Sequence, residues 1–292
     1  MYAIYDRNPH TRYKDFIFNR FVRVGPLAVI FFLAAMTIFQ GKVQPSLHVI
    51  DFVSLQFNSN RSYQIAPLWT IAVEFQLYLI TPILYFIAAK RGIKALLGLI
   101  FVLSILRFLM IEQGKFAGVF AYDISYYSAQ ARIDQFAAGM LAYRIQAKNG
   151  TLFSNPIHIV FSVAPLTALF FFSSSYNWAD DSMLAGAVKT YYLSIEGALC
   201  AYLMLAVLQA NIRIPFERLL ARLGVASYSV YLWHQAIVAT YLKEFPRIFG
   251  NGVIDAIAEI ALVLFPVVML VSYASFKWLE EPMLEFRKNY RS

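Results

Sequence analysis

The sequence predicts an all-α fold: a polytopic transmembrane bundle of about eight helices, forming one domain over residues 1–292, with both termini in the cytoplasm. Hydrophobic residues make up 60% of the chain and charged residues only 14%, whereas soluble domains carry about a quarter charged residues. Apolar runs of 15 to 25 residues repeat along the chain, and about 20 such residues span a bilayer as a helix. Lys and Arg gather in alternate connections between the runs, a pattern that sets membrane topology.

Each apolar run should be helical, because an isolated segment in hydrocarbon must satisfy its own backbone hydrogen bonds. The fourth run is the shortest, but removing it would invert the charge pattern of everything downstream. The predicted spans are 24–40, 67–88, 95–111, 131–145, 157–175, 184–208, 223–242 and 253–276.

The net charge of +8 is explained by topology, so we expect the lipid bilayer and not nucleic acid as a partner. With the N-terminus inside, the inner connections hold 17 Lys and Arg and the outer ones six, while Arg107 and Lys189 fall within spans. Cys200 is the single cysteine, which argues against a disulfide or a thiolate metal cluster. No His, Cys, Asp or Glu spacing resembles a metal site, and residues 1–23 do not resemble a cleaved signal peptide.

Polar residues near the outer ends of two spans are candidates for substrate contact. An ionisable group within a span costs free energy, so it is expected to be paired with another group or to have a function. Glu74 and Tyr78, with Trp69 nearby, share one helix face in the second span. They could form a structural hydrogen-bonded pair or the polar wall of a substrate cavity. Arg132 and Asp134 open the fourth span and are two residues apart, so we expect different partners for each; Arg132 could also simply extend to the membrane interface.

The seventh span carries a stripe of hydrogen-bonding groups, Ser227, Tyr231 and His234, at helical spacing. His234 would lie roughly 17 Å from the inner end of the span. Its imidazole could act as an acid or base, or serve as a hydrogen-bonded structural residue. At the inner mouth of the first span, Arg20 and Arg23 are three residues apart on one face, a fork suited to the phosphates of a nucleotide-type donor, although topology alone could also account for them.

Five motifs in order resemble the membrane acyltransferase 3 family, which includes O-acetyltransferases of bacterial polysaccharides and lipopolysaccharides and nodulation-factor acyltransferases. Residues 20–26 read R-F-V-R-V-G-P, similar to the family's R-x-x-R-x-x-P. Residues 68–78 and 227–234 resemble W-S-L-x-V-E-x-Q-F-Y and S-Y-S-x-Y-L-x-H. Residues 132–139 resemble R-x-x-x-F-x-x-G, and 281–282 resemble a late E-P ending.

The resemblance implies a multi-pass enzyme of the bacterial inner membrane that moves an acyl group, usually acetyl, from cytoplasmic acyl-CoA to a sugar hydroxyl of a surface polysaccharide or glycolipid. On this reading no cofactor is bound, and acyl-CoA is the donor substrate. Glu74, Tyr231 and His234 would be catalytic, positioning the general base or the acceptor. The donor or acceptor would be bound by Arg20, Arg23, Trp69, Tyr78, Arg132 and Asp134.

The chain departs from the family at its N-terminus. The family normally begins with two helices that carry an R-x10-H element, whose His is the presumed base, and we expect this chain to lack both. His10 does not replace that His, because it precedes Arg20 in a polar stretch. Two alternatives therefore stay open: a non-catalytic or truncated relative, and a transporter, although paired broken helices and internal repeats typical of transporters are not evident.

Overall fold

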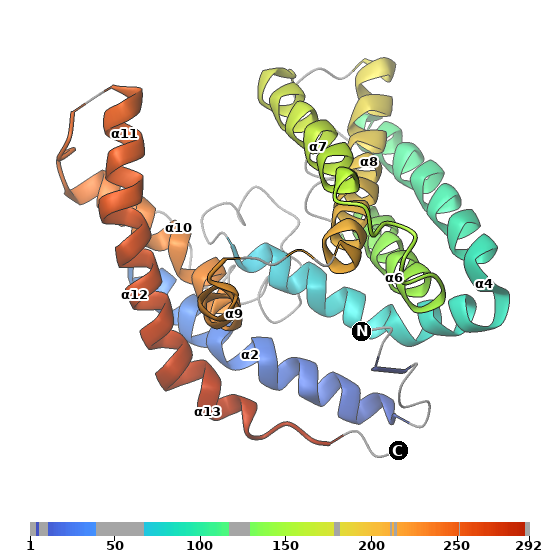
Figure 1. Ribbon diagram of the computed structural model, residues 1–292, viewed down its shortest axis with the longest axis horizontal. Coiled ribbons are helices and arrows are strands. Elements are labelled where there is room, and N and C mark those ends of the chain that lie inside the picture. Colours follow the sequence, from blue (N-terminus) through green and yellow to red (C-terminus); the bar gives the residue numbers. More distant parts are fainter. Residues whose placement is uncertain are drawn as a thin grey trace. The chain divides into compact units, whose positions relative to one another are not determined.

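The computed structural model describes residues 4–5, 11–38, 67–116, 129–177, 182–210, 212, 215–250 and 252–289 (Figure 1). Every regular element within these ranges is a helix, which confirms the predicted all-α, membrane-type fold. Five helical stretches are long and apolar enough to cross a membrane, namely Tyr13–Ala35, Leu68–Gln113, Ile157–Ser175, Met183–Gln209 and Val253–Leu284. The number of helices that cross and the side on which the termini lie stay predictions.

The longest of these stretches, α4 (Leu68–Phe116), contains the second and third predicted spans and is broken between them. At Gly92 the backbone leaves the helical region, with φ 75° and ψ −166°. Residues with a Cβ adopt a positive φ only at a cost, whereas glycine does so readily. The break therefore lies where the sequence places a basic connection, between Lys90 and Lys94.

The contacts of the chain group into two compact units, and α4 contributes to both. We call Arg12–Phe75 with Ile214–Tyr290 the terminal unit, and Met1–Thr11 with Gln76–Arg213 and Arg291–Ser292 the central unit. The prediction of a single membrane domain stays a prediction.

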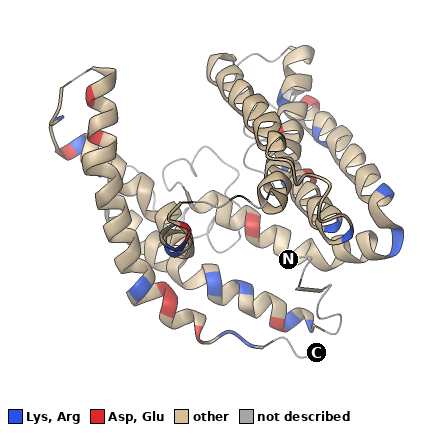
Figure 2. Ribbon diagram, viewed as in Figure 1, with Lys and Arg blue, Asp and Glu red and all other residues tan. Residues whose placement is uncertain are grey.

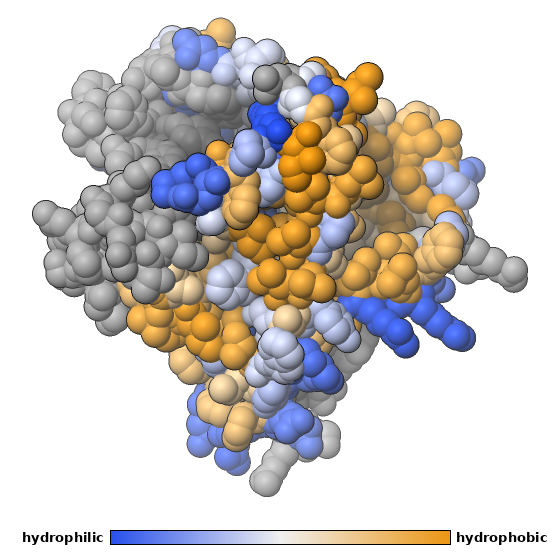
Figure 3. Space-filling view, turned by 90° about the vertical axis from the view of Figure 1, so that its left-hand side faces the viewer, coloured by the Kyte–Doolittle hydropathy of each residue, from blue (hydrophilic) through white to orange (hydrophobic). Residues whose placement is uncertain are grey.

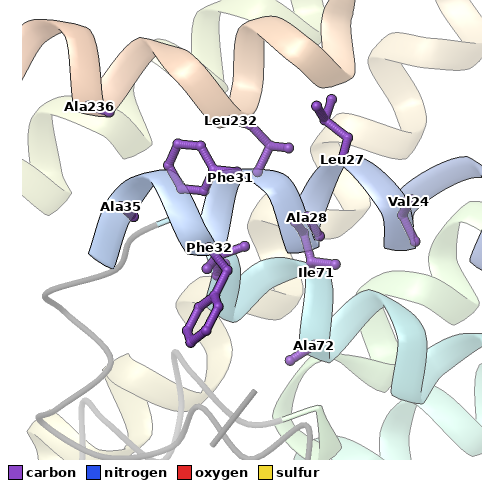
Figure 4. Packing of buried hydrophobic residues seen from close by; sticks show 11 residues of the cluster. Val24, Leu27, Ala28, Phe31, Phe32, Ala35, Ile71, Ala72, Leu232 and Ala236 are labelled. Carbon is purple, nitrogen blue, oxygen red and sulfur yellow. The ribbon is translucent and has the colours of Figure 1, made fainter. Parts of the chain in front are cut away.

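The core of the terminal unit forms where α2 (Tyr13–Ile38) and α10 (Ser227–Glu244) pack together with the first turns of α4 (Figure 4). Phe31 and Leu232 are completely buried there. The Trp233 ring meets Phe31 edge to face at 5.3 Å between ring centroids. Ala28 of α2 and Ala72 of α4 belong to the same buried cluster as Leu232, so this core fixes α10 against both α2 and the start of α4.

The C-terminal part of the terminal unit is one helical rod (Figure 1). Two of its turns are widened. The rod consists of α11 (Val253–Glu259), the π turn η3 (Ile260–Leu264), α12 (Phe265–Ser275), the π turn η4 (Phe276–Glu280) and α13 (Glu281–Leu284). The N–H groups of Phe265 and Glu281 each donate to a carbonyl five residues back. Each π turn ends two residues before a proline, Pro266 or Pro282. A proline ring clashes with the carbonyl four residues back, and a widened turn relieves that clash.

The central unit packs α6 (Ile133–Lys148) and α7 (Ile157–Ser175) against α8 (Met183–Gln209). The α6 and α8 backbones approach closely at Gly197, where an added Cβ would lie 2.8 Å from Gln135 Cγ and 3.1 Å from its Cα. A second apolar cluster joins both halves of α4 to α6 through Leu84, Leu96 and Met140.

Many large hydrophobic side chains point outward, and they cover much of the face drawn in Figure 3. Leu184 in α8, Ile254 in α11 and Leu270 in α12 are 77%, 81% and 74% exposed. Apolar groups of this size are exposed without cost when the surrounding solvent is lipid. These exposed faces therefore fit the bilayer environment indicated by the composition.

Candidate functional site

Three of the five sequence motifs, and residues 68–75 of a fourth, lie in the terminal unit. The helix α10 carries one of them and contacts the others directly or through a neighbouring turn. The Tyr228 hydroxyl donates to the Val24 carbonyl of α2 at 2.6 Å. The Ser229 hydroxyl donates to the Glu280 carboxylate of η4 at 2.9 Å, and both side chains are buried. Sequence reasoning did not identify this pair, because Glu280 lies beyond the predicted span 253–276 and its burial was not evident from the sequence.

The start of α4 meets α10 through two hydroxyl groups. Thr70 Oγ1 and the Tyr231 hydroxyl are 2.6 Å apart. Thr70 Oγ1 also donates to the Pro67 carbonyl at 2.9 Å. Because a threonine hydroxyl has one proton, Tyr231 must be the donor to Thr70 when both bonds form. This contact places Tyr231 against the motif that contains Trp69 and Glu74.

Glu74 lies one helical turn beyond Thr70 and therefore on the same face of α4. Its side chain is partly buried, as is that of Trp69, which packs against the core of the terminal unit. Glu74, Tyr231 and His234 thus all belong to one unit. Tyr78, the other member of this motif with a predicted role, is almost fully buried and belongs to the central unit.

His234 has a defined tautomer when its ring is neutral. Its Nδ1 lies 2.6 Å from the Tyr231 carbonyl and 3.2 Å from the Val230 carbonyl. A carbonyl only accepts, so Nδ1 carries the proton and Nε2 keeps the lone pair. The ring is partly exposed, with its centroid 5.7 Å from that of Tyr231. Nε2 is therefore the atom of this ring that can accept a proton or a hydrogen bond.

Arg20 and Arg23 lie on α2, and the C-terminal segment is bound to the same helix, which sequence reasoning did not predict. Arg20 is partly buried, with its guanidinium 5.5 Å from the centre of the Phe16 ring, and Arg23 is exposed. Asn19 holds the C-terminal segment beside α2 by two reciprocal 2.7 Å hydrogen bonds with the backbone of Lys288. Because these two residues are far apart in the sequence, the sequence did not predict this contact.

The fifth motif lies in the central unit, where Asp134 is tied into a buried ion pair. Asp134 contacts Arg107, and both side chains are 1% exposed. The other carboxylate oxygen accepts from Ser194 at 2.6 Å. Arg132 donates instead to Gln135 at 3.0 Å, so Arg132 and Asp134 do have different partners, as their spacing predicted. Substrate contact by either residue stays a prediction.

The described residues place no group of three or more His, Cys, Asp or Glu side chains where a metal ion could be held. What the terminal unit offers instead is a set of hydroxyl, imidazole and carboxylate groups on two helices that are packed together. Such groups can bind and orient a hydroxyl and move a proton, the elements of general acid–base catalysis.

A family model described as an acyltransferase domain matches residues 2–276. No curated protein and no solved structure gives a significant match to the chain.

Proposed function

We propose a membrane O-acyltransferase function, on the premise that this chain belongs to the acyltransferase family just described. The donor we propose is a cytoplasmic acyl-CoA, with acetyl as the acyl group. The acceptor is a sugar hydroxyl of a cell-surface polysaccharide or glycolipid, and the site of action is the bacterial inner membrane. The helices that are long and apolar enough to span a bilayer support the membrane setting.

The reaction joins an acceptor oxygen to the thioester carbon. The hydroxyl oxygen attacks the carbonyl carbon, a C–O bond forms, and the C–S bond breaks to release CoA. The proton leaves the hydroxyl for a base and ends on the CoA thiol. General base catalysis typically contributes about 10² to 10⁴ in rate.

The observation that carries the proposal is the fixed His234 tautomer beside the Thr70–Tyr231 hydrogen bond. With Nδ1 bound to the backbone, Nε2 can accept a hydrogen bond from the acceptor hydroxyl. Tyr231 and Glu74 then position the hydroxyl, or the base that takes its proton. Each of these groups is held by a helix that packs in the core of the terminal unit.

The remaining predicted residues bind the two substrates in this proposal. Arg20 and Arg23 hold the CoA phosphates at the inner mouth, where a guanidinium fork suits a phosphate. In the terminal unit, Trp69 contacts the acceptor. Tyr78 and Arg132 belong to the central unit, and acceptor contact by these two stays a prediction from the sequence motifs. Asp134 acts through its ion pair, which anchors the start of α6 from which Arg132 extends.

The test is acetyl-CoA turnover by the purified full chain in lipid nanodiscs, followed by release of the CoA thiol with and without a sugar acceptor. We expect His234→Gln to lower kcat by about 10² to 10⁴ and to leave the KM for acetyl-CoA unchanged. The matched control is His158→Gln, because His158 is bonded to the Tyr202 hydroxyl at 2.6 Å within the central unit. The His158→Gln variant should keep the wild-type kcat.

Two variants test the other roles, one a double substitution and one a single substitution. Arg20→Gln with Arg23→Gln should raise the KM for acetyl-CoA more than it lowers kcat. Unchanged acetyl transfer in Glu74→Ala would remove Glu74 from the mechanism.

The alternatives give different results in the same assay. A folded wild-type chain that releases no thiol above the blank would favour a non-catalytic relative. Acceptor movement across the bilayer without thioester cleavage would favour a transporter.

A further inference from the structure

A basic cavity lies in the central unit, between the break in α4 and the C-terminal end of α6. Its volume is about 620 Å³. Arg91, Gly92 and Lys94 line it from α4, and Arg144 and Lys148 line it from α6, where Tyr143 also contributes. None of its eight lining residues is Asp or Glu. Four cations around one concave surface repel one another, and a bound anion relieves that repulsion.

The break at Gly92 shapes one wall of this cavity. The second half of α4 begins just after Gly92, and its first residues, Ile93 and Lys94, line the cavity. The first N–H groups of a helix have no intrahelical acceptor and carry partial positive charge. A helix start next to basic side chains is a recurrent phosphate-binding arrangement.

The four cations divide into one that supports the cavity and three that remain directed to solvent. Arg144 donates to the carbonyl of Ala88, whose side chain is fully buried in the first half of α4. This bond ties α6 to the turn before the break. Arg91, Lys94 and Lys148 are exposed at the same cavity.

The position of the cavity along the chain points to the cytoplasmic surface. All four cations belong to connections that the charge pattern predicts to be inside. Figure 2 shows Lys and Arg at the bend of α4 and at the end of α6. The volume falls within the roughly 300–1,000 Å³ of small-molecule sites, larger than a lone phosphate ion needs.

We propose that this cavity binds a phosphate group carried by an organic ligand at the cytoplasmic membrane surface. Two sources share this chemistry: the headgroup of an anionic phospholipid and the phosphates of a coenzyme A thioester. The site is separate from Arg20 and Arg23, which belong to the other unit. The proposal concerns binding and does not depend on acyl transfer.

The experiment compares two triple variants of the full chain that lose the same charge. The cavity variant combines Arg91→Gln, Lys94→Gln and Lys148→Gln, and keeps Arg144 because it holds the walls together. The control variant combines Lys90→Gln, Arg218→Gln and Arg222→Gln. Lys90 lies close to the break but contacts the Phe86 ring at 4.2 Å, and Arg218 and Arg222 are exposed on α9 (Glu217–Val225).

Binding is measured in two arms after gel filtration and thermal melting have shown that all three proteins are folded. One arm uses native mass spectrometry with phosphatidylglycerol against phosphatidylcholine. The other uses isothermal titration with coenzyme A against its 3′-dephospho form. We expect the affinity of the cavity variant to fall about tenfold or more in one arm, because it loses hydrogen bonds to a charged group. The affinity of the control variant should stay within about twofold of the wild-type value.

The arm that responds identifies the source of the phosphate. The proposal is overturned if the wild type prefers neither phosphatidylglycerol nor coenzyme A, or if both variants weaken binding equally. Thiol release measured on the same samples keeps this result distinct from the acyl-transfer proposal, because binding can fail while turnover persists.

Discussion

Substitution of Asp134 by Asn should destabilise the central unit strongly, because it leaves a buried cation without its counter-charge. Arg107 and Asp134 are each 1% exposed, so water cannot compensate for the loss. Arg107 would keep the Thr190 carbonyl at 2.8 Å and the Ser194 hydroxyl at 3.2 Å, but a neutral amide oxygen would replace its charged partner. Breaking one side of a buried ion pair costs about 3–5 kcal/mol. A loss of that size lowers Tm by roughly 6–20 °C.

The assay is a double-mutant cycle read by thermal melting of the purified chain. Arg107→Gln alone should cost about as much as Asp134→Asn alone. The double variant removes both charges, so it should lose about 2–3 kcal/mol less than the sum of the two single losses. Lys277→Gln serves as the control, because the Lys277–Glu281 pair is exposed and should leave Tm unchanged.

Two results would refute this reasoning. Equal and small Tm changes in Asp134→Asn and in the control would show that the pair is not buried in the folded protein. Strict additivity in the cycle would show that the two side chains do not interact.

Four further substitutions test packing, a buried hydrogen bond and backbone geometry by the same melting assay. Gly197→Ala should lower the free energy of unfolding by about 1–3 kcal/mol, because the added methyl group overpacks the α6–α8 contact. An added Cβ at Gly139 meets nothing within 4 Å, so Gly139→Ala should be neutral or stabilise the protein by roughly 0.5–1 kcal/mol. Equal effects of the two substitutions would contradict the close approach of α6 and α8. Ser229→Ala should cost about 1–3 kcal/mol because it leaves the buried Glu280 carboxylate without its donor, and an unchanged Tm would mean that the pair does not form. Gly92→Ala should cost about 1–3 kcal/mol because φ 75° with ψ −166° is a conformation that essentially only glycine adopts, and a stabilised variant would mean that the helix is unbroken.

Helix positions were predictable from the sequence because the bilayer imposes one simple length and polarity on every span. The runs 157–175 and 184–208 correspond closely to α7 and α8. The separation of 67–88 from 95–111 corresponds to the break at Gly92. Charged residues such as Lys90 and Lys94 lower the local hydropathy, so they mark the connection between these two spans.

Partners of the polar residues were less predictable, because periodicity shows that a buried group needs a partner without identifying it. The sequence placed Arg107 within a span but gave no means to pair it with Asp134 on another helix. The Thr70–Tyr231 contact joins residues 161 positions apart, and motif order alone does not fix such a distance. Shared helix faces, such as that of Glu74, were deducible because they depend only on local geometry.

The two π turns decide where the C-terminal rod can change its length. A π turn holds one residue more than the α-helical turn that would replace it, so loss of a single residue from Phe276–Glu280 can convert it to an α-helical turn while the helices on both sides keep nearly the same rotation. Loss of a residue from the regular helix α12 has no such compensation and rotates one side of the rod by about 100° relative to the other. The rod could then keep either the Glu259–Tyr241 bond or the Glu280–Ser229 bond to α10, but not both. A one-residue deletion should therefore be tolerated far better in a π turn than in α12.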